Sequence, residues 1–110
     1  MTMFNERESA FEAKFAHDEE FRFLATARRD KLFAHWAGDS LGVPGTEIEA
    51  MTSKVLHLRD GAGHDERVLE HMATVFANHG IAAIPQTLSA ALAACAKQAR
   101  EELLASPHFT

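Results

Sequence analysis

Seven histidines in 110 residues are the side chains with the most evident capacity for chemistry, and the first chemistry to consider is metal binding. A zinc pair on a helix needs two ligands about one turn apart, as in a His-x-x-x-His arrangement. No two histidines have that spacing. His57, His64 and His71 follow one another at intervals of seven, but Gly61 and Gly63 interrupt any helical face that they could share. The sequence therefore predicts scattered, partly solvated histidines and no metal site.

The other reactive side chains form no recognisable catalytic or cofactor-binding pattern. Glu19 and Glu20 are adjacent, and neighbours on a helix point in different directions, so they do not form an acid/base pair. The glycines match no phosphate-binding loop, and no serine lies in a nucleophile elbow. The single cysteine, Cys95, lies among alanines in a helical pattern and is interpreted as a small core residue. We therefore expect no enzymatic activity and no cofactor.

The composition restricts the class of protein and of partner. A chain of 110 residues fits one domain, and a hydrophobic content of 46% allows a modest core. The formal net charge of -5 argues against general binding to nucleic acid or to anionic membranes. No apolar run is long enough to span a bilayer, and residues 1–8 lack the character of an export signal. A cytoplasmic protein without direct membrane insertion is expected.

The elements that must carry these side chains are predicted to be helices, because no stretch alternates like a strand between turn signals. Asp18 and Asp65 are the expected N-caps, and Thr46 with Glu49 forms a capping box. Gly80 suits the left-handed position after a helix. The fold class is therefore all-α, a small four-helix bundle. The helices are expected to begin near Asp18, Thr46, Asp65 and Pro85 and to end near Leu41, Gly61, Asn78 and Ser106.

The inner faces of these helices follow from apolar residues three or four positions apart. The expected core residues are Phe21, Leu24, Ala25, Leu32 and Trp36 in the first helix, Ile48, Met51, Val55 and Leu58 in the second, Val68, Met72, Val75 and Phe76 in the third, and Ile84, Leu88, Leu92, Cys95, Ala99 and Leu103 in the fourth.

The segment before Asp18 differs from the rest of the chain. Spacings of seven and four place Phe4, Phe11 and Phe15 on one helical stripe among charged or small residues. Isolated helices of this length are marginal in water. We therefore expect residues 1–17 to form a flexible N-terminal arm and residues 18–110 to form the four-helix body, although the arm could merge with the first helix when a partner supports it. The pattern alone leaves open whether these rings bind a partner or pack on the bundle.

The N-terminal third of the chain carries a combination of residues that is more specific than its composition. It reads Phe4, Arg7-Glu8, Ala10-Phe11-Glu12, Lys14-Phe15-Ala16 and His17-Asp18-Glu19, followed by Ala27-Arg28-Arg29, Lys31-Leu32 and Trp36-Ala37. This pattern resembles the zeta subunit of alphaproteobacterial F-type ATP synthases, and a weaker match continues through Gly63-His64 and Gly80. Two positions depart from the family pattern, because Ala34 stands where a glycine is expected and Ile84-Pro85-Gln86 lacks an acidic opening.

The resemblance implies a natural inhibitor of ATP hydrolysis by the synthase. Its N-terminal region would become helical between catalytic subunits near the rotor and would block hydrolysis while allowing synthesis. The implied partners are the alpha, beta and gamma subunits of the catalytic head, through which a free monomer would associate with the membrane-bound enzyme. By position, the inhibitory residues are Phe4, Arg7, Glu8, Phe11, Glu12, Lys14 and Phe15. The residues for docking, or for packing of the following helix, are Arg28, Arg29 and Trp36.

A different class of function stays open as an alternative. A small helical module could bind ATP or ADP near its one basic cluster, formed by Arg28, Arg29 and Lys31. In isolation, that cluster is also what the solvated side of a helix would look like.

Overall fold

Four helices make up the described part of the chain. The structure is a computed structural model that describes the backbone of residues 3–109 and the side chains of residues 6–109. The helices are α1 (Met3–Leu41), α2 (Gly45–Leu56), α3 (His64–Asn78) and α4 (Pro85–Leu104). Residues 3–109 contain no strand, so the predicted all-α class is confirmed. None of the four helices combines the length and hydropathy needed to cross a membrane.

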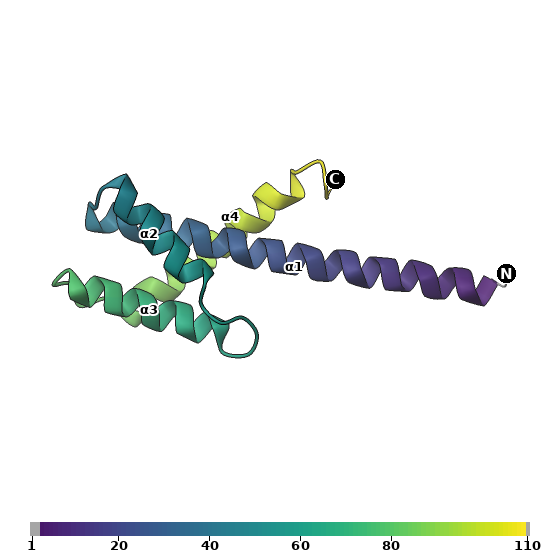
Figure 1. Cartoon of the computed structure of the whole chain (residues 1–110), viewed down its shortest axis with the longest axis horizontal. Coiled ribbons are helices and arrows are strands. Elements are labelled where there is room, and N and C mark those ends of the chain that lie inside the picture. The colour runs from purple at the N-terminus through teal and green to yellow at the C-terminus, as the bar shows by residue number, and fades with distance from the viewer. Residues whose placement is uncertain (1–2, 110) are drawn as a thin grey trace.

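The first helix is longer than the sequence pattern predicts. α1 is one continuous helix of 39 residues, and its N-terminal part projects far beyond the other three helices (Figure 1). Asp18 lies inside this helix, so the N-cap predicted there is wrong. One ion pair crosses the expected boundary, between Lys14 and Asp18 at 3.0 Å, and a second, between Arg22 and Glu19 at 2.6 Å, follows directly after it. Pairs at these spacings favour the helix locally. The arm and the first helix are therefore continuous in the described residues, a merger that was expected only with the support of a partner.

The core lies between the second half of α1 and one face of each of the other helices. Most predicted inner residues of α2, α3 and α4 are buried. The prediction is wrong for Ile84, which is 61% exposed. On α1 the buried face is shifted from the predicted stripe: Phe33 and Ala34 are fully buried, whereas Leu32 and Trp36 are only partly buried. The shift arises because α1 packs against all three other helices. The buried cluster comprises Phe33, Ala34, Ala37, Met51, Val55, Val68, Met72, Phe76, Leu88, Leu92 and Cys95.

The starts of α2 and α3 lack the side-chain caps that the sequence predicts. No side chain caps the N-terminus of α2, so the capping box of Thr46 and Glu49 is wrong. The N-cap position of α3 lies two residues before the predicted Asp65, at Gly63 with a φ of 81°, and the helix begins at His64. Asp65 therefore lies in the first turn of α3, where its carboxylate is free to take a different partner.

The end of α3 agrees with the prediction. Gly80 has a φ of 77°, in the left-handed region that favours glycine. Its N–H donates to the carbonyl of Ala77 at 2.9 Å, and the N–H of Ile81 donates to the carbonyl of Phe76 at 3.0 Å. These two bonds form a Schellman motif, which satisfies carbonyl groups at the helix end.

Candidate functional site

The projecting part of α1 is the most exposed apolar feature of the structure. Every residue from 6 to 20 is exposed, and the side chains of Phe11 and Phe15 are 72% and 61% exposed. Because these rings are four residues apart, they lie on the same side of the helix. Packing of these rings on the bundle was the alternative to a binding role, and the two rings do not pack there. Large apolar side chains gathered on an exposed surface are typical of a protein interaction site.

The charged residues predicted for the same role surround these rings. Arg7, Glu8 and Glu12 are exposed on the projecting segment. Lys14 is exposed as well, and its ion pair with Asp18 is too solvated to hold it firmly. The backbone of Phe4 belongs to α1, but its side chain lies outside the described residues. The described inhibitory candidates therefore share one accessible helical segment.

The three predicted docking residues lie in three different environments. Trp36 is partly buried and stacks on Phe33, with ring centroids 5.6 Å apart. Arg28 lies at the surface, where its Nη1 atom is 3.7 Å from Glu102 Oε2. Arg29 is only 11% exposed and points into the protein. Packing therefore accounts for Trp36, and of the three only Arg28 presents an exposed charge.

Arg29 belongs to a buried polar network that the sequence patterns do not reveal. The centre of the network is Asp30 on α1, which is 2% exposed. Its carboxylate accepts hydrogen bonds from His64 Nε2 at 2.7 Å and from Arg29 Nε at 2.9 Å. Arg29 Nη1 also donates to Asp65 at 2.9 Å. The network therefore ties the middle of α1 to the first turn of α3.

The environment of His64 favours its protonated form. Burial by itself would lower the pKa of His64, but hydrogen bonds to Asp30 and to the carbonyl of Arg59, with the charges of Asp30 and Asp60, outweigh burial and raise it. The expectation of partly solvated histidines is therefore wrong for His64, which is 7% exposed. Within the described residues, no group of three histidine, cysteine or acidic side chains could hold a metal ion.

The structure confirms that Cys95 is a core residue. Its side chain is buried, and burial raises the pKa of the thiol despite the opposing effect of Arg29. A buried thiol with a raised pKa is a poor nucleophile.

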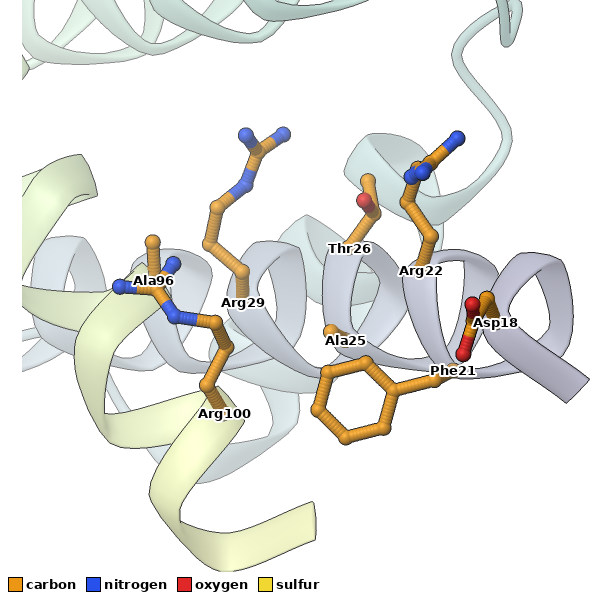
Figure 2. Close-up of a pocket in the computed structure, with 8 residues that line it drawn as sticks. All are labelled: Asp18, Phe21, Arg22, Ala25, Thr26, Arg29, Ala96 and Arg100. Carbon is orange, nitrogen blue, oxygen red and sulfur yellow. The ribbon is translucent and has the colours of Figure 1, made fainter. Parts of the chain in front are cut away.

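Two hollows between α1 and the C-terminal part of the chain divide the basic cluster. The first, of about 410 Å³, is lined by Arg29, and Figure 2 shows Arg100 reaching into it from α4 and Phe21 lying along it from α1. The second, of about 690 Å³, is lined by Arg28, Lys31 and Glu102 together with mainly apolar side chains. The three basic residues proposed to hold a nucleotide therefore do not share one hollow.

Comparison with known proteins gives one match. The family model described as ATPase inhibitor subunit zeta matches residues 1–102. The match spans the projecting segment of α1, the buried network and most of α4. Curated proteins and solved structures gave no match.

Proposed function

Since this chain belongs to the ATPase inhibitor subunit zeta family, we propose that it inhibits ATP hydrolysis by a bacterial F-type ATP synthase, with residues 1–17 as the inhibitory arm. The chain acts as a regulatory subunit and not as a catalyst. The observation that carries the proposal is the exposure of Phe11 and Phe15 on a helical segment that projects from the body. Such a segment fits a groove between two other subunits, where its apolar stripe becomes buried.

In the proposed mechanism, the arm enters the interface between catalytic subunits of the head, close to the rotor. The rings of Phe11 and Phe15 fill apolar sites there, and Arg7, Glu8, Glu12 and Lys14 contact the polar rim. The inserted helix blocks hydrolysis and allows synthesis, so that it works as a one-way stop. The partners in this proposal are the alpha, beta and gamma subunits, and the free protein is a monomer.

The energetics indicate that the arm does not act alone. Burying Phe11 and Phe15 contributes about 3–6 kcal/mol before costs. The loss of translational and rotational freedom removes at least about 4 kcal/mol of this gain. A second contact through the body would raise the effective concentration of the arm at its site. Arg28 is a candidate for that contact, because its guanidinium is exposed and arginine is enriched at interfaces.

The test is to separate the arm from the body. Deleting residues 1–16 should abolish inhibition of ATP hydrolysis by the cognate synthase, and far-ultraviolet circular dichroism should show that the helical body still folds. A peptide of residues 1–17 should inhibit much less than the full chain, because it lacks the second contact. Inhibition by the truncated body equal to that of the full chain would contradict the proposal.

A second candidate function is nucleotide binding by the body. The observation in its favour is the hollow of about 690 Å³ that combines Arg28 and Lys31 with mainly apolar walls, with Glu102 as its one acidic side chain. Cavities of this size and character are common among small-molecule sites. Titration with ATP or ADP should then shift the backbone amide signals of the residues around this hollow. Absence of such shifts in the full chain, with inhibition intact, would remove this candidate.

A further inference from the structure

The C-terminal tail turns back from α4 onto the middle of α1. His108 Nε2 lies 2.9 Å from Glu20 Oε1, across 88 residues of sequence. The ring of Phe109 meets Phe21 edge to face, with centroids 5.1 Å apart, and lies 4.8 Å from the ring of His17. Figure 1 shows the C-terminal end of the chain beside α1, close to where that helix leaves the body. The hydrogen bond and the ring contacts of the tail therefore fall on one short stretch of α1, from His17 to Phe21.

The position of this stretch is what gives the contact its meaning. Among the hydrogen bonds, ion pairs and ring contacts of the described residues, those made by His108 and Phe109 are the nearest to the N-terminus that join α1 to another part of the chain. Residues 6–16 are exposed, and the one ion pair that begins in this stretch, from Lys14 to Asp18, stays within α1. The tail contact therefore marks the boundary between supported and projecting helix.

We propose that His108 and Phe109 are positioning residues for the inhibitory arm. They hold α1 at residues 17–21, and thereby fix where the projecting segment begins and the direction in which it leaves the body. We call the contacts of His108 and Phe109 with residues 17–21 the clamp. The clamp is a property of the free chain, whereas its effect on inhibition rests on the proposed function. The tail follows the matched residues 1–102, so the family match does not supply this role.

Chemistry and geometry support a clamp that is weak enough to be tested by mutation. An edge-to-face pair of phenylalanines is an attractive arrangement beyond simple burial. The imidazole of His108 can donate to the carboxylate of Glu20, but their side chains are 58% and 48% exposed, so this bond is the weaker part. Loss of both contacts should release the local helix and leave the core intact, because the core cluster includes neither tail residue.

The experiment replaces both residues in the full chain with His108→Ala and Phe109→Ala. In the free protein, amide hydrogen exchange across residues 13–21 should accelerate on the order of tenfold, with exchange in α2 and α3 unchanged. The concentration for half-maximal inhibition should rise several-fold at unchanged maximal inhibition, because the arm is less pre-organised. The matched control is Leu104→Ala, since Leu104 is 55% exposed at the end of α4 and makes none of the clamp contacts. A conservative pair, His108→Gln with Phe109→Tyr, should restore slow exchange.

The outcomes separate the two proposals. Unchanged exchange across residues 13–21 in the double variant would overturn the clamp. Faster exchange throughout the protein would overturn it too, since the tail would then support the whole fold and not the arm. Faster local exchange with an unchanged half-inhibitory concentration would overturn the positioning role. Failure of the unaltered chain to inhibit would instead overturn the proposed function, and the exchange result would still decide the clamp.

Discussion

His64 Nε2 lies 2.7 Å from Asp30 Oδ2, and this hydrogen bond joins two residues that are 7% and 2% exposed. The two residues are separated by 34 positions and lie on α3 and α1. A carboxylate buried to this degree is stable only when hydrogen bonds and opposite charges compensate for lost water. Asp30 receives both from His64 and Arg29. The stability of the body therefore depends on a polar contact inside its core.

Removal of the central carboxylate should be among the most damaging single changes in the body. Asp30→Ala leaves Arg29 and His64 without their shared partner, and breaking a buried ion pair costs about 3–5 kcal/mol. The matched control is Asp65→Ala, because Asp65 pairs with the same arginine but is 62% exposed, and should cost about 1 kcal/mol or less. Urea unfolding of both variants measures the two losses. Equal small losses would show that the network is not stabilising.

The raised pKa of His64 predicts how stability depends on pH. The folded protein binds the His64 proton more tightly than the unfolded chain does. The stabilisation is therefore fully present below the unfolded pKa of about 6.5 and is lost as pH rises through the higher folded pKa. In denaturant unfolding from pH 5 to 9, the advantage of the unaltered chain over His64→Gln should shrink as pH increases. An advantage of the unaltered chain that grows towards high pH would contradict the assignment.

The phenylalanine stripe should be needed for inhibition and not for folding. Phe11→Ala with Phe15→Ala removes the apolar surface proposed to enter the synthase, so inhibition of ATP hydrolysis should be lost. The melting temperature should barely change, because surface substitutions usually alter stability by about 0.5 kcal/mol or less. Phe23→Ala is the matched control: Phe23 is 61% exposed, as Phe15 is, but lies on the body side of the boundary. Loss of inhibition with Phe23→Ala alone would move the inhibitory surface into the body.

The close approach of α1 to α2 should make a larger side chain at Gly38 destabilising. A Cβ added there would overlap the side chain of Ile48, which is buried. Overpacking costs about 1–3 kcal/mol, and the better helix propensity of alanine returns about 1 kcal/mol of that. Gly38→Ala should therefore destabilise the protein by about 1 kcal/mol. Gly45→Ala, at the start of α2 with no atom near the added Cβ, should not destabilise it in the same unfolding assay.

The sequence predicts the helices of the body well because their signals are local and periodic. The spacing of Leu88, Leu92 and Cys95 identifies the buried side of α4, and Gly80 identifies the end of α3. The start of α1 could not be found in the same way. Asp18 is a good N-cap, but it also fits the interior of a helix, where it pairs with Lys14 one turn earlier. The sequence is the same in both cases, so it cannot distinguish them.

In the candidate site, too, residues with a local signal could be predicted and residues joined only by distant contacts could not. Phe11 and Phe15 stand out because their spacing lies within a few turns of one helix, and the family resemblance adds their expected role. The partnership of Asp30 with His64 has no local signal, because a charged residue on a helix usually faces solvent. Only the packing of α3 against α1 brings the two together, so sequence patterns alone could not assign them.

The continuity of α1 makes the arm a lever. At about 1.5 Å per residue, residues 3–16 reach about 21 Å beyond the stretch that the tail holds. A tilt of about 10° at this stretch would move the N-terminal end of the arm sideways by about 4 Å, which is more than the length of a hydrogen bond. A small change in how the body rests on its partner is thus amplified at the far end of the arm. Two glycines placed within residues 17–21 would preserve every ring and charge of the arm, but the direction of the arm would no longer be fixed by the body.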